Sequence, residues 1–486
     1  MRVREEAEML TYDLNHRGQS SIYEYLYQCI RQDIQTGVLT AGERLPSKRS
    51  LARHLNIGVI TVANAYEQLL TEGYIRAEER RGYFVQDISG YSRKADLRAE
   101  DYPPEPPERE FFADFKANRI GLQHFPAATW NRFMREALSQ PNDSLLKTVP
   151  YNGLYELRLA ISEYLLRNRG MRVMPSQIVI GAGTEYLYSR LMQMFGRACT
   201  FAIEDPGYKK FAAISASFGN PWKYIPIDDS GLMIDKLEES GADVVHVSPS
   251  NHFPTGIVMP ITRRLELSEW VGRVKKRYII EDDYDSEFRY SGKFILPMYA
   301  EDTQNKVIYM NTFSKSMVPS LRISYMVLPP DLLQRYIDTM SFYSCTVSSF
   351  EQYALARFIS EGHFERHINH MRNYYRGQRA RILSAVKNSP LGGISKIIEQ
   401  NAGTHFLLNV RTSLSEEEVR RAGLKADLSL SMYSDYSYSD AGTSSCTLVI
   451  NYAGIPQEKI AEVAARLSSI FPECSGKNGD GSRGGR

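Results

Sequence analysis

The chain has 486 residues, and at about 100 to 200 residues per domain this length predicts two to four folded units. Its 43% hydrophobic and 24% charged residues are typical of a globular protein and exclude global disorder or a fibrous repeat. The formal net charge of +2 is close to balance, so a nucleic-acid partner has to be inferred from local charge.

The N-terminal segment and the cysteines favour a cytoplasmic protein. The first residues, MRVREEAEMLTYDLN, lack the apolar core of a signal peptide, and no uninterrupted stretch approaches the roughly 18 apolar residues that cross a bilayer. The five cysteines are scattered without a C-x-x-C pair, which argues against a disulfide framework or a zinc site. We therefore expect a water-soluble cytoplasmic chain with no metal and no membrane partner.

The first predicted unit, residues 15–86, has the pattern of a winged helix-turn-helix, mainly helical with a β-wing. Apolar residues that recur every four positions before Gly37 predict an amphipathic packing helix, and they are Ile22, Leu26, Ile30 and Ile34. Ser47 is suited to cap a second helix that runs to Leu55, and a turn over 56–58 leads into a third helix over 59–72. This is helix-turn-helix spacing.

Two short β runs follow, and Arg80, Arg81 and Gly82 lie between them. They predict a basic hairpin that can enter a DNA groove as a wing. A few arginines on a small helical domain are more often a solvated surface. The ordered series of helix, turn, helix and basic hairpin nevertheless favours DNA binding.

The segments LPSKRSLA, TVANAYEQL and EGYI resemble the winged DNA-binding domain of the GntR superfamily over roughly the first 90 residues. The resemblance implies contacts with phosphates or a guanine edge, because cations neutralise phosphates and arginine bonds bidentately. The DNA-binding residues that it implies are Arg44, Ser47, Lys48, Arg49, Thr61, Asn64, Arg80, Arg81 and Gly82. Many relatives begin the recognition helix with Ser-Arg, where this chain has Gly58 and Val59, so the target sequence does not transfer.

Three further ranges complete the predicted domain organisation. Residues 87–110 include DYPPEPPERE and are interpreted as a linker, since proline favours extended, semi-stiff backbone. Residues 111–472 form the second unit. Residues 473–486, glycine-rich and polar, are expected to be a disordered tail.

The second unit alternates short apolar runs with longer helical stretches, which predicts α/β architecture. The runs are QIVIGAG, CTFAIEDPGY, DVVHVSP, YIIEDDY, KVIYMNTFSK and ISYMVLP. Buried parallel strands are continuous apolar runs, and ligands gather at their carboxyl ends. Those ends read GAGT, EDPGY, SPSN, EDDYD and NTFSK.

Lys315 lies just beyond a predicted strand in NTFSKSMVPSLRISY, with Thr312 and Ser314 before it and Arg322 seven residues later. A lysine amine forms a Schiff base with an aldehyde cofactor, while hydroxyls and a guanidinium hold a phosphate. One loop would therefore attach pyridoxal phosphate both covalently and ionically.

Three further loops offer the other contacts that this cofactor needs. YIIEDDYDSEFRY offers Asp282 for the pyridinium nitrogen and Tyr284 for the ring oxygen. GAGTEY places Gly183 and Thr184 at a strand-to-helix step, where free N–H groups attract phosphate. EDPGY would set the ring of Tyr208 against the pyridine. Each feature alone has an ordinary structural explanation, so the hypothesis depends on their order and joint chemistry.

These motifs resemble fold-type I aminotransferases, and the whole chain resembles the MocR group of GntR regulators, which fuse both domains. Supporting segments are YNGLYELRLAISEYLLRNRG, SPSNHFPTGIVMP and FPAATW. The resemblance implies an aminotransferase-like domain with a smaller C-terminal α+β part, which binds pyridoxal 5'-phosphate. The implied cofactor contacts are the Schiff base of Lys315 and Asp282, Tyr284, Tyr208, Gly183, Thr184, Asn251, Thr312, Ser314 and Arg322. Asn251 and His252 occupy the loop where aminotransferases place an asparagine, with a shifted spacing before Pro254.

Two positions bear on whether the pocket turns over a substrate. Aminotransferases hold the substrate carboxylate with an arginine in a C-terminal segment patterned Leu-Arg-Leu-Gly-Phe, where this chain has Val449 in LVINY. Loss of that bidentate contact favours sensing over turnover. Lys210 lies where some amino-acid-sensing relatives have an arginine, and it is either an effector contact or a surface lysine.

The resulting hypothesis is a transcription regulator that senses an amino compound, or pyridoxal phosphate itself, through its aminotransferase-like domain. The family forms head-to-tail homodimers, which would suit a repeated or palindromic DNA operator. One alternative is a working aminotransferase with an accessory DNA-binding domain. Another is a regulator whose large domain is only a dimerisation scaffold.

Overall fold

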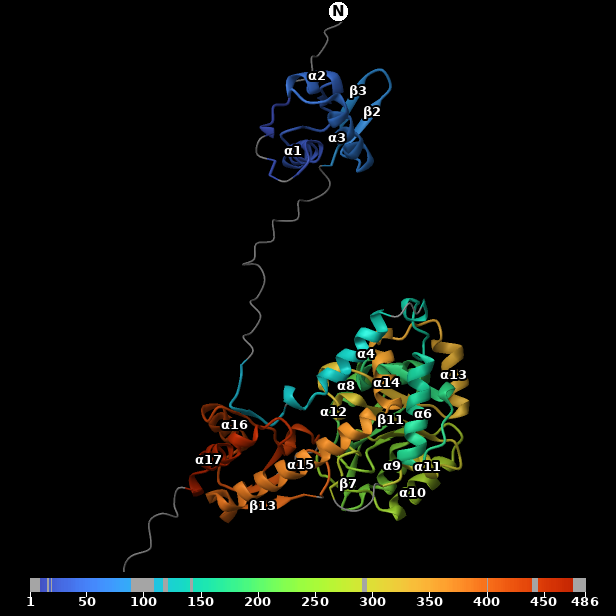
Figure 1. Cartoon of the computed structure of the whole chain (residues 1–486), viewed down its shortest axis with the longest axis vertical. Helices are drawn as coiled ribbons and strands as arrows, with labels where there is room; N and C mark the ends of the chain where they lie inside the picture. The colour runs from blue at the N-terminus through green and yellow to red at the C-terminus, as the bar shows by residue number, and fades with distance from the viewer. Residues whose placement is uncertain are drawn as a thin grey trace, which may run out of the picture. The chain divides into compact units, whose positions relative to one another are not determined.

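The structure is a computed structural model, and it describes residues 9–14, 17–18, 20–88, 109–116, 121–139, 143–290, 295–399, 401–438 and 445–474. The chain divides into two compact units, Met1–Glu108 and Arg109–Arg486 (Figure 1). Residues 89–108 of the predicted linker and 475–486 of the predicted tail lie outside the described residues. No helix of the described part combines the length and the apolar character needed to span a bilayer.

The N-terminal unit is the winged helix-turn-helix expected from the sequence. Its elements are α1 (Ile22–Thr36), β1 (Arg44–Leu45), α2 (Lys48–His54), α3 (Val59–Thr71), β2 (Ile75–Glu78) and β3 (Gly82–Val85). The strands form an antiparallel sheet in the order β1-β3-β2. Gly37 ends α1 in the left-handed conformation with φ of 76°. Ser47 caps α2, because its side chain accepts a hydrogen bond from the Ser50 amide at 3.1 Å.

The core of this unit begins earlier in the chain than residue 15, where the sequence placed its start. Leu26, Ile30 and Ile34 of α1 are buried in one cluster with residues of α2 and α3, and Leu10 packs against that cluster. The Tyr12 hydroxyl also donates a hydrogen bond of 2.7 Å to an Asp33 carboxylate oxygen. Residues 9–14 are therefore part of the folded unit.

The larger unit is built on an eight-stranded sheet. Its strands in spatial order are β5 (Ile178–Gly181), β12 (Ser324–Val327), β11 (Val307–Thr312), β10 (Tyr278–Asp282), β9 (Val244–Val247), β6 (Phe201–Asp205), β7 (Trp222–Asp228) and β8 (Gly231–Leu232). Strands β11, β10, β9, β6 and β7 are parallel to their neighbours in that run. Strand β12 is antiparallel to both β11 and β5. The α/β architecture is confirmed.

Helices cover both faces of this sheet, which is why strands such as β5, β9 and β12 are buried along their whole length. Ile280 of β10 packs in a cluster with residues of α7, α8 and α13, while the adjacent Ile279 packs on the opposite face with residues of α9 and α10. The helices of this part are α4 (Ala127–Ser139), α5 (Asp143–Leu146), α6 (Tyr155–Arg169), α7 (Thr184–Phe195), α8 (Lys209–Ser217), α9 (Ile234–Ser240), α10 (Ile261–Gly272), α11 (Met298–Glu301), α12 (Phe313–Ser316), α13 (Pro330–Met340) and α14 (Ser349–Ser360).

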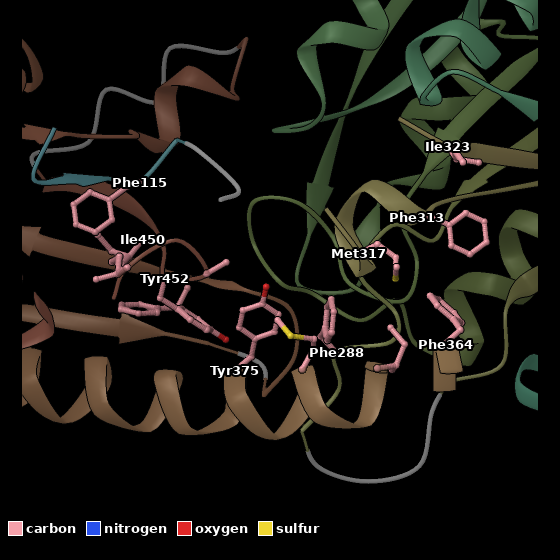
Figure 2. Packing of buried hydrophobic residues seen from close by; sticks show 14 of the residues in the cluster. Phe115, Phe288, Phe313, Met317, Ile323, Phe364, Tyr375, Ile450 and Tyr452 are labelled. Atoms are coloured by element: carbon pink, nitrogen blue, oxygen red, sulfur yellow. The ribbon is translucent and has the colours of Figure 1, made fainter. Parts of the chain in front are cut away.

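A smaller C-terminal α+β part follows the long helix α15 (His363–Asn388). It contains β13 (Ser395–Ile398), β14 (His405–Arg411), α16 (Glu416–Lys425), β15 (Leu428–Ser429), β16 (Ser445–Asn451) and α17 (Ile460–Ile470), and β15 pairs with β4 (Ala113–Asp114). One apolar cluster continues from this part into the main sheet along α15, from Ile450 and Tyr452 past Tyr375 to Phe364 (Figure 2). The two parts therefore share a core.

Two residues of the segment that the sequence assigned to the tail, Glu473 and Cys474, are described by the structure and contact the rest of the unit. The Glu473 carboxylate accepts hydrogen bonds from the Ser413 amide at 2.8 Å and from the Thr412 hydroxyl at 3.0 Å. Glu473 and Cys474 belong to a short 3-10 turn, Pro472–Cys474. Glu473 and Cys474 are therefore part of the folded unit.

Candidate functional site

The carboxyl ends of the parallel strands surround a cavity of about 170 Å³. Strand β6 leads to Gly207 and Tyr208, β9 to Ser248, β10 to Asp282 and Tyr284, and β11 to Thr312 and Lys315. Thr184 enters from the start of α7. The described residues that line the cavity are Thr184, Glu204, Gly207, Tyr208, His246, Ser248, Phe253, Asp282, Tyr284, Thr312 and Lys315.

Asp282 presents one satisfied and one unsatisfied carboxylate oxygen. The Tyr188 hydroxyl donates to Oδ2 at 2.8 Å, and His246 Nε2 lies 3.6 Å from the same oxygen. Oδ1 is buried and has no hydrogen-bond partner among the described residues. A buried acceptor without a partner is costly, so this oxygen suits a ligand that brings an N–H donor.

Lys315 and Tyr284 lie together at the cavity. The Lys315 ammonium nitrogen is 5.9 Å from the centre of the Tyr284 ring. The Tyr284 hydroxyl is buried and, within the described part of the chain, unpartnered. Burial, followed by the neighbouring Asp285 carboxylate, raises the pKa of Tyr284. The phenol is therefore available as a hydrogen-bonding group beside the only side-chain amine of the described cavity lining.

The predicted phosphate residues meet beside Thr184 and Thr312. Gly183 has φ of 95°, a conformation that favours glycine, and a Cβ atom on it would overlap the present position of the Arg322 guanidinium. The Thr312 hydroxyl accepts a hydrogen bond of 3.1 Å from the Ser314 amide. The Ser314 hydroxyl is buried with no partner among the described residues. The Thr312 hydroxyl also accepts a hydrogen bond from the Ser324 hydroxyl at 2.8 Å, so Ser314 offers the unpartnered hydroxyl of this pair. A cation, this hydroxyl and a helix start together form an anion-binding environment.

A carboxylate that the sequence did not single out contacts two predicted ligand residues. The Glu185 carboxylate forms ion pairs with the Arg322 guanidinium, at an N–O distance of 2.5 Å, and with the Lys210 ammonium group, at 3.0 Å. Hydrogen bonding to Lys210, and then the charges of Lys210 and Arg322, lower the pKa of Glu185. Lys210 is exposed and is not among the residues that line the cavity. A phosphate at this end would compete with Glu185 for Arg322.

Asn251 is not among the described residues that line the cavity, so its contact with the cofactor stays a prediction. It lines a separate small pocket with residues that include Arg169, Asp285 and Arg289. Phe253, which directly precedes Pro254, lines the cavity instead. The shifted spacing in SNHFPTG thus moves the asparagine away from the lining and puts an aromatic ring there.

Sequence reasoning gave no role to Tyr188, Glu204, His246, Ser248 or Phe253. Glu204 is buried and accepts the Ser248 amide at 3.0 Å. His246 is the only polar residue inside the otherwise apolar strand β9, VVHV. A polar side chain in a fully buried strand was the signal that could have identified it.

Glu204 makes the folding stability of the larger unit depend on pH. Burial raises the pKa of Glu204 to about 8, against about 4.3 in an unfolded chain. The folded state therefore keeps a proton that the unfolded state loses, and the stability contributed by this group is lost as pH rises from the unfolded value towards 8. Between pH 6.5 and 7.5 the free energy of unfolding of the wild type should therefore fall as pH rises. We expect this slope to be shallower in Glu204→Gln, by up to about 1.4 kcal/mol per pH unit.

Urea unfolding of the cofactor-free chain, followed by tryptophan fluorescence, measures this slope. All three tryptophans, Trp130, Trp222 and Trp270, lie in the larger unit, so the signal reports that unit alone. Glu269→Gln on the exposed side of α10 is the matched control and should keep the wild-type slope. Equal slopes for Glu204→Gln and the wild type would refute the assignment.

The N-terminal unit exposes most of its predicted DNA-binding residues. Arg44, Ser47, Arg49, Asn64, Arg80 and Arg81 are exposed, and Lys48, Thr61 and Gly82 are partly exposed. The Lys48 nitrogen lies 5.0 Å from the centre of the Tyr83 ring in the wing. The Arg44 side chain packs against Gly82, where φ is 115°. Cations before and within α2 are thus held beside the hairpin, while Arg81 pairs with Glu78 at 2.5 Å.

Val449 occupies the position at which aminotransferases have the carboxylate-binding arginine. It is buried on β16 and pairs with Leu407 of β14. Its neighbours in sequence, Leu448 and Ile450, belong to the main apolar cluster, so Val449 points to the other side of the strand. No arginine lines the described part of the cavity. A carboxylate clamp of the usual kind is absent from that lining.

Comparisons with known proteins cover both units. Residues 121–467 match the family described as aminotransferase class I and II, and residues 22–85 match bacterial regulatory proteins of the gntR family. The HTH-type transcriptional regulator YdeL of Bacillus subtilis is 36% identical, over 95% of this chain and 99% of its own length. The probable rhizopine catabolism regulatory protein MocR of Rhizobium meliloti is 29% identical, over 93% and 94%. A kynurenine aminotransferase structure from Pyrococcus horikoshii shares the fold, with a TM-score of 0.66 at 23% identity, over 75% of this chain and 91% of that chain.

Proposed function

Because the chain belongs to the MocR-type GntR regulators, which join a DNA-binding domain to an aminotransferase class I and II domain, we propose that it regulates transcription in response to a ligand at Lys315. The ligand site would hold pyridoxal 5'-phosphate, and the signal would be an amino compound or the cofactor itself. The observation that carries this proposal is the cavity in which Lys315 and the unpartnered oxygens of Asp282 and Tyr284 lie together.

The residues around the cavity fit the groups of pyridoxal phosphate. Asp282 Oδ1 would accept the protonated ring nitrogen, and the Tyr284 hydroxyl would bond the ring oxygen. Ser314, Thr184 and Arg322 would hold the phosphate. Thr312 and the Gly183 backbone would contribute to the same end, and Tyr208 would cover the ring. When bound, the cofactor supplies an aldehyde and an electron-withdrawing ring, which react with amines.

We propose sensing rather than physiological turnover. The described residues that line the cavity include Lys315 but no arginine, and Val449 stands where aminotransferases place the carboxylate clamp. Lys210 is a poor replacement, because its side chain is exposed and it is not among the described residues that line the cavity. Steady conversion of an amino donor and a keto acid at ordinary enzymatic rates would favour the alternative, a working aminotransferase with an accessory DNA-binding domain.

A homodimer is supported by an exposed apolar face on α6. The buried side of this helix includes Leu157 and Ile161, yet Tyr155, Leu159 and Leu166 are exposed. At 100° per residue these three positions fall within 40° of one another. Apolar side chains on both sides of a helix indicate a second packing partner, and a second copy of the chain is the partner that we propose. Residues 87–110 would then tether each DNA-binding unit to its larger unit.

Recovery of genomic DNA fragments bound by the full-length chain tests the regulator function. We expect enrichment of a few promoter fragments that contain two related half-sites, since two subunits would present two DNA-binding units. Failure to enrich any fragment over bulk genomic DNA would refute DNA-binding regulation.

A further inference from the structure

The recognition helix α3 lacks the side chains that most often read guanine. Its sequence, VITVANAYEQLLT, contains neither lysine nor arginine, and its only charged residue is Glu67. Arginine or lysine bonded to the guanine edge is the commonest specific base contact in the major groove. Any base contacts made by α3 itself must therefore come from uncharged polar or apolar side chains or from Glu67, and not from arginine or lysine.

Two β-branched apolar side chains occupy the first turn of α3 and face solvent. Val59 is 45% exposed and Ile60 is 76% exposed. The apolar residues of α3 that serve the fold are buried, and they are Val62, Ala65, Tyr66 and Leu69. Val59 and Ile60 are not part of that core cluster. The first turn of a recognition helix is also the part that meets base edges.

The neighbouring side chains match one kind of base pair. Asn64 is exposed one turn beyond Ile60, and residues four apart share a helix face. An asparagine amide bonds the donor and acceptor of adenine. Arg44 and Lys48, held beside the wing, carry positive charge that complements DNA phosphates. Phosphate contacts from these cations would position the first turn of α3 over the bases.

We propose that α3 reads A·T base pairs, with Val59 and Ile60 packed on thymine methyl groups and Asn64 bonded to adenine. This inference rests on the proposed function as a DNA-binding regulator. Thymine alone among the four bases carries a methyl group in the major groove, so apolar contact there distinguishes it. Burial of one methyl group corresponds to an affinity gain of about fourfold.

Removal of single thymine methyl groups tests this contact. Duplexes of the recovered genomic fragment are made with one thymine at a time replaced by deoxyuridine, and the affinity of the full-length chain is measured. We expect a loss of about fourfold for the wild type at one or more positions in each half-site. Ile60→Ala should bind the thymine and uracil duplexes equally at the position that Ile60 contacts. Because Ile60 is exposed, its truncation leaves the core intact.

Val38→Ala is the matched control, since Val38 is 69% exposed and lies outside the helix-turn-helix. It should discriminate thymine from uracil as the wild type does. Specific binding with equal affinity for thymine and uracil at every position would overturn the inference and leave the regulator function standing. Discrimination by Ile60→Ala equal to that of the wild type would overturn the role of Ile60. A failure to enrich any fragment would remove the regulator function and this inference together.

Discussion

Replacement of Lys315 by alanine is expected to abolish covalent attachment of pyridoxal phosphate. Lys315 supplies the only side-chain amine among the described residues that line the cavity, and the aldehyde of the cofactor bonds to an amine. After incubation with the cofactor and borohydride reduction, the wild type should gain one pyridoxyl phosphate group per chain. Peptide mapping by mass spectrometry should place it on Lys315, and the variant should gain none under the same conditions.

The matched control for this experiment is Lys236→Ala. Lys236 lies on the surface of α9, where it pairs with Glu239, and it is not among the cavity residues. This variant should be labelled to the wild-type extent. An equally labelled Lys315→Ala chain, or a label that maps to another lysine, would contradict the assignment. A wild type that takes up no cofactor would favour the dimerisation-scaffold alternative.

Arg169→Met is expected to destabilise the larger unit by about 3–5 kcal/mol, because it leaves buried carboxylates without their cation. Arg169 is buried and forms an ion pair with buried Asp283. The Tyr309 hydroxyl donates to the same carboxylate at 2.8 Å. Burial raises the pKa of the nearby Glu287 to about 7, and the charge of Arg169 opposes that rise. Loss of Arg169 therefore affects more than one acidic group.

Urea unfolding at constant pH, followed by the fluorescence of the three tryptophans of the larger unit, measures this loss. Arg273→Met is the control, since Arg273 forms an exposed pair with Glu269 at 2.8 Å on α10. An exposed pair contributes about 0–1 kcal/mol, so this variant should remain near the wild type. Similar free energies of unfolding for the two variants would show that Arg169 does not stabilise the buried acidic cluster.

The fold and the position of the cavity could be predicted because both follow from local pattern. Continuous apolar runs predict strands buried on both faces, and the carboxyl ends of parallel strands converge. Lys315, Asp282 and Tyr284 each follow such a run, so their proximity could be predicted from the order of the motifs. The stripe of α1 and the cap at Ser47 are similarly local.

The remaining features depend on the path of loops and on contacts between distant residues. Asn251 could not be placed, because one shift in a loop decides whether it or Phe253 lines the cavity. The bond from Tyr188 to Asp282 joins residues 94 positions apart, and no sequence spacing encodes it. Glu185 pairs with both Arg322 and Lys210. These contacts depend on how α7, α8 and the loop after α12 pack together, which the sequence does not specify locally.

The affinity of the full-length chain for its recovered operator, measured without and with saturating pyridoxal phosphate, tests the central claim most directly. If the cavity at Lys315 controls DNA binding, ligand binding at one site changes affinity at the other, and couplings of this kind are typically about 5- to 150-fold. The account predicts a change in that range for the wild type. Equal operator affinity for the cofactor-free chain and the chain loaded at Lys315 would contradict it.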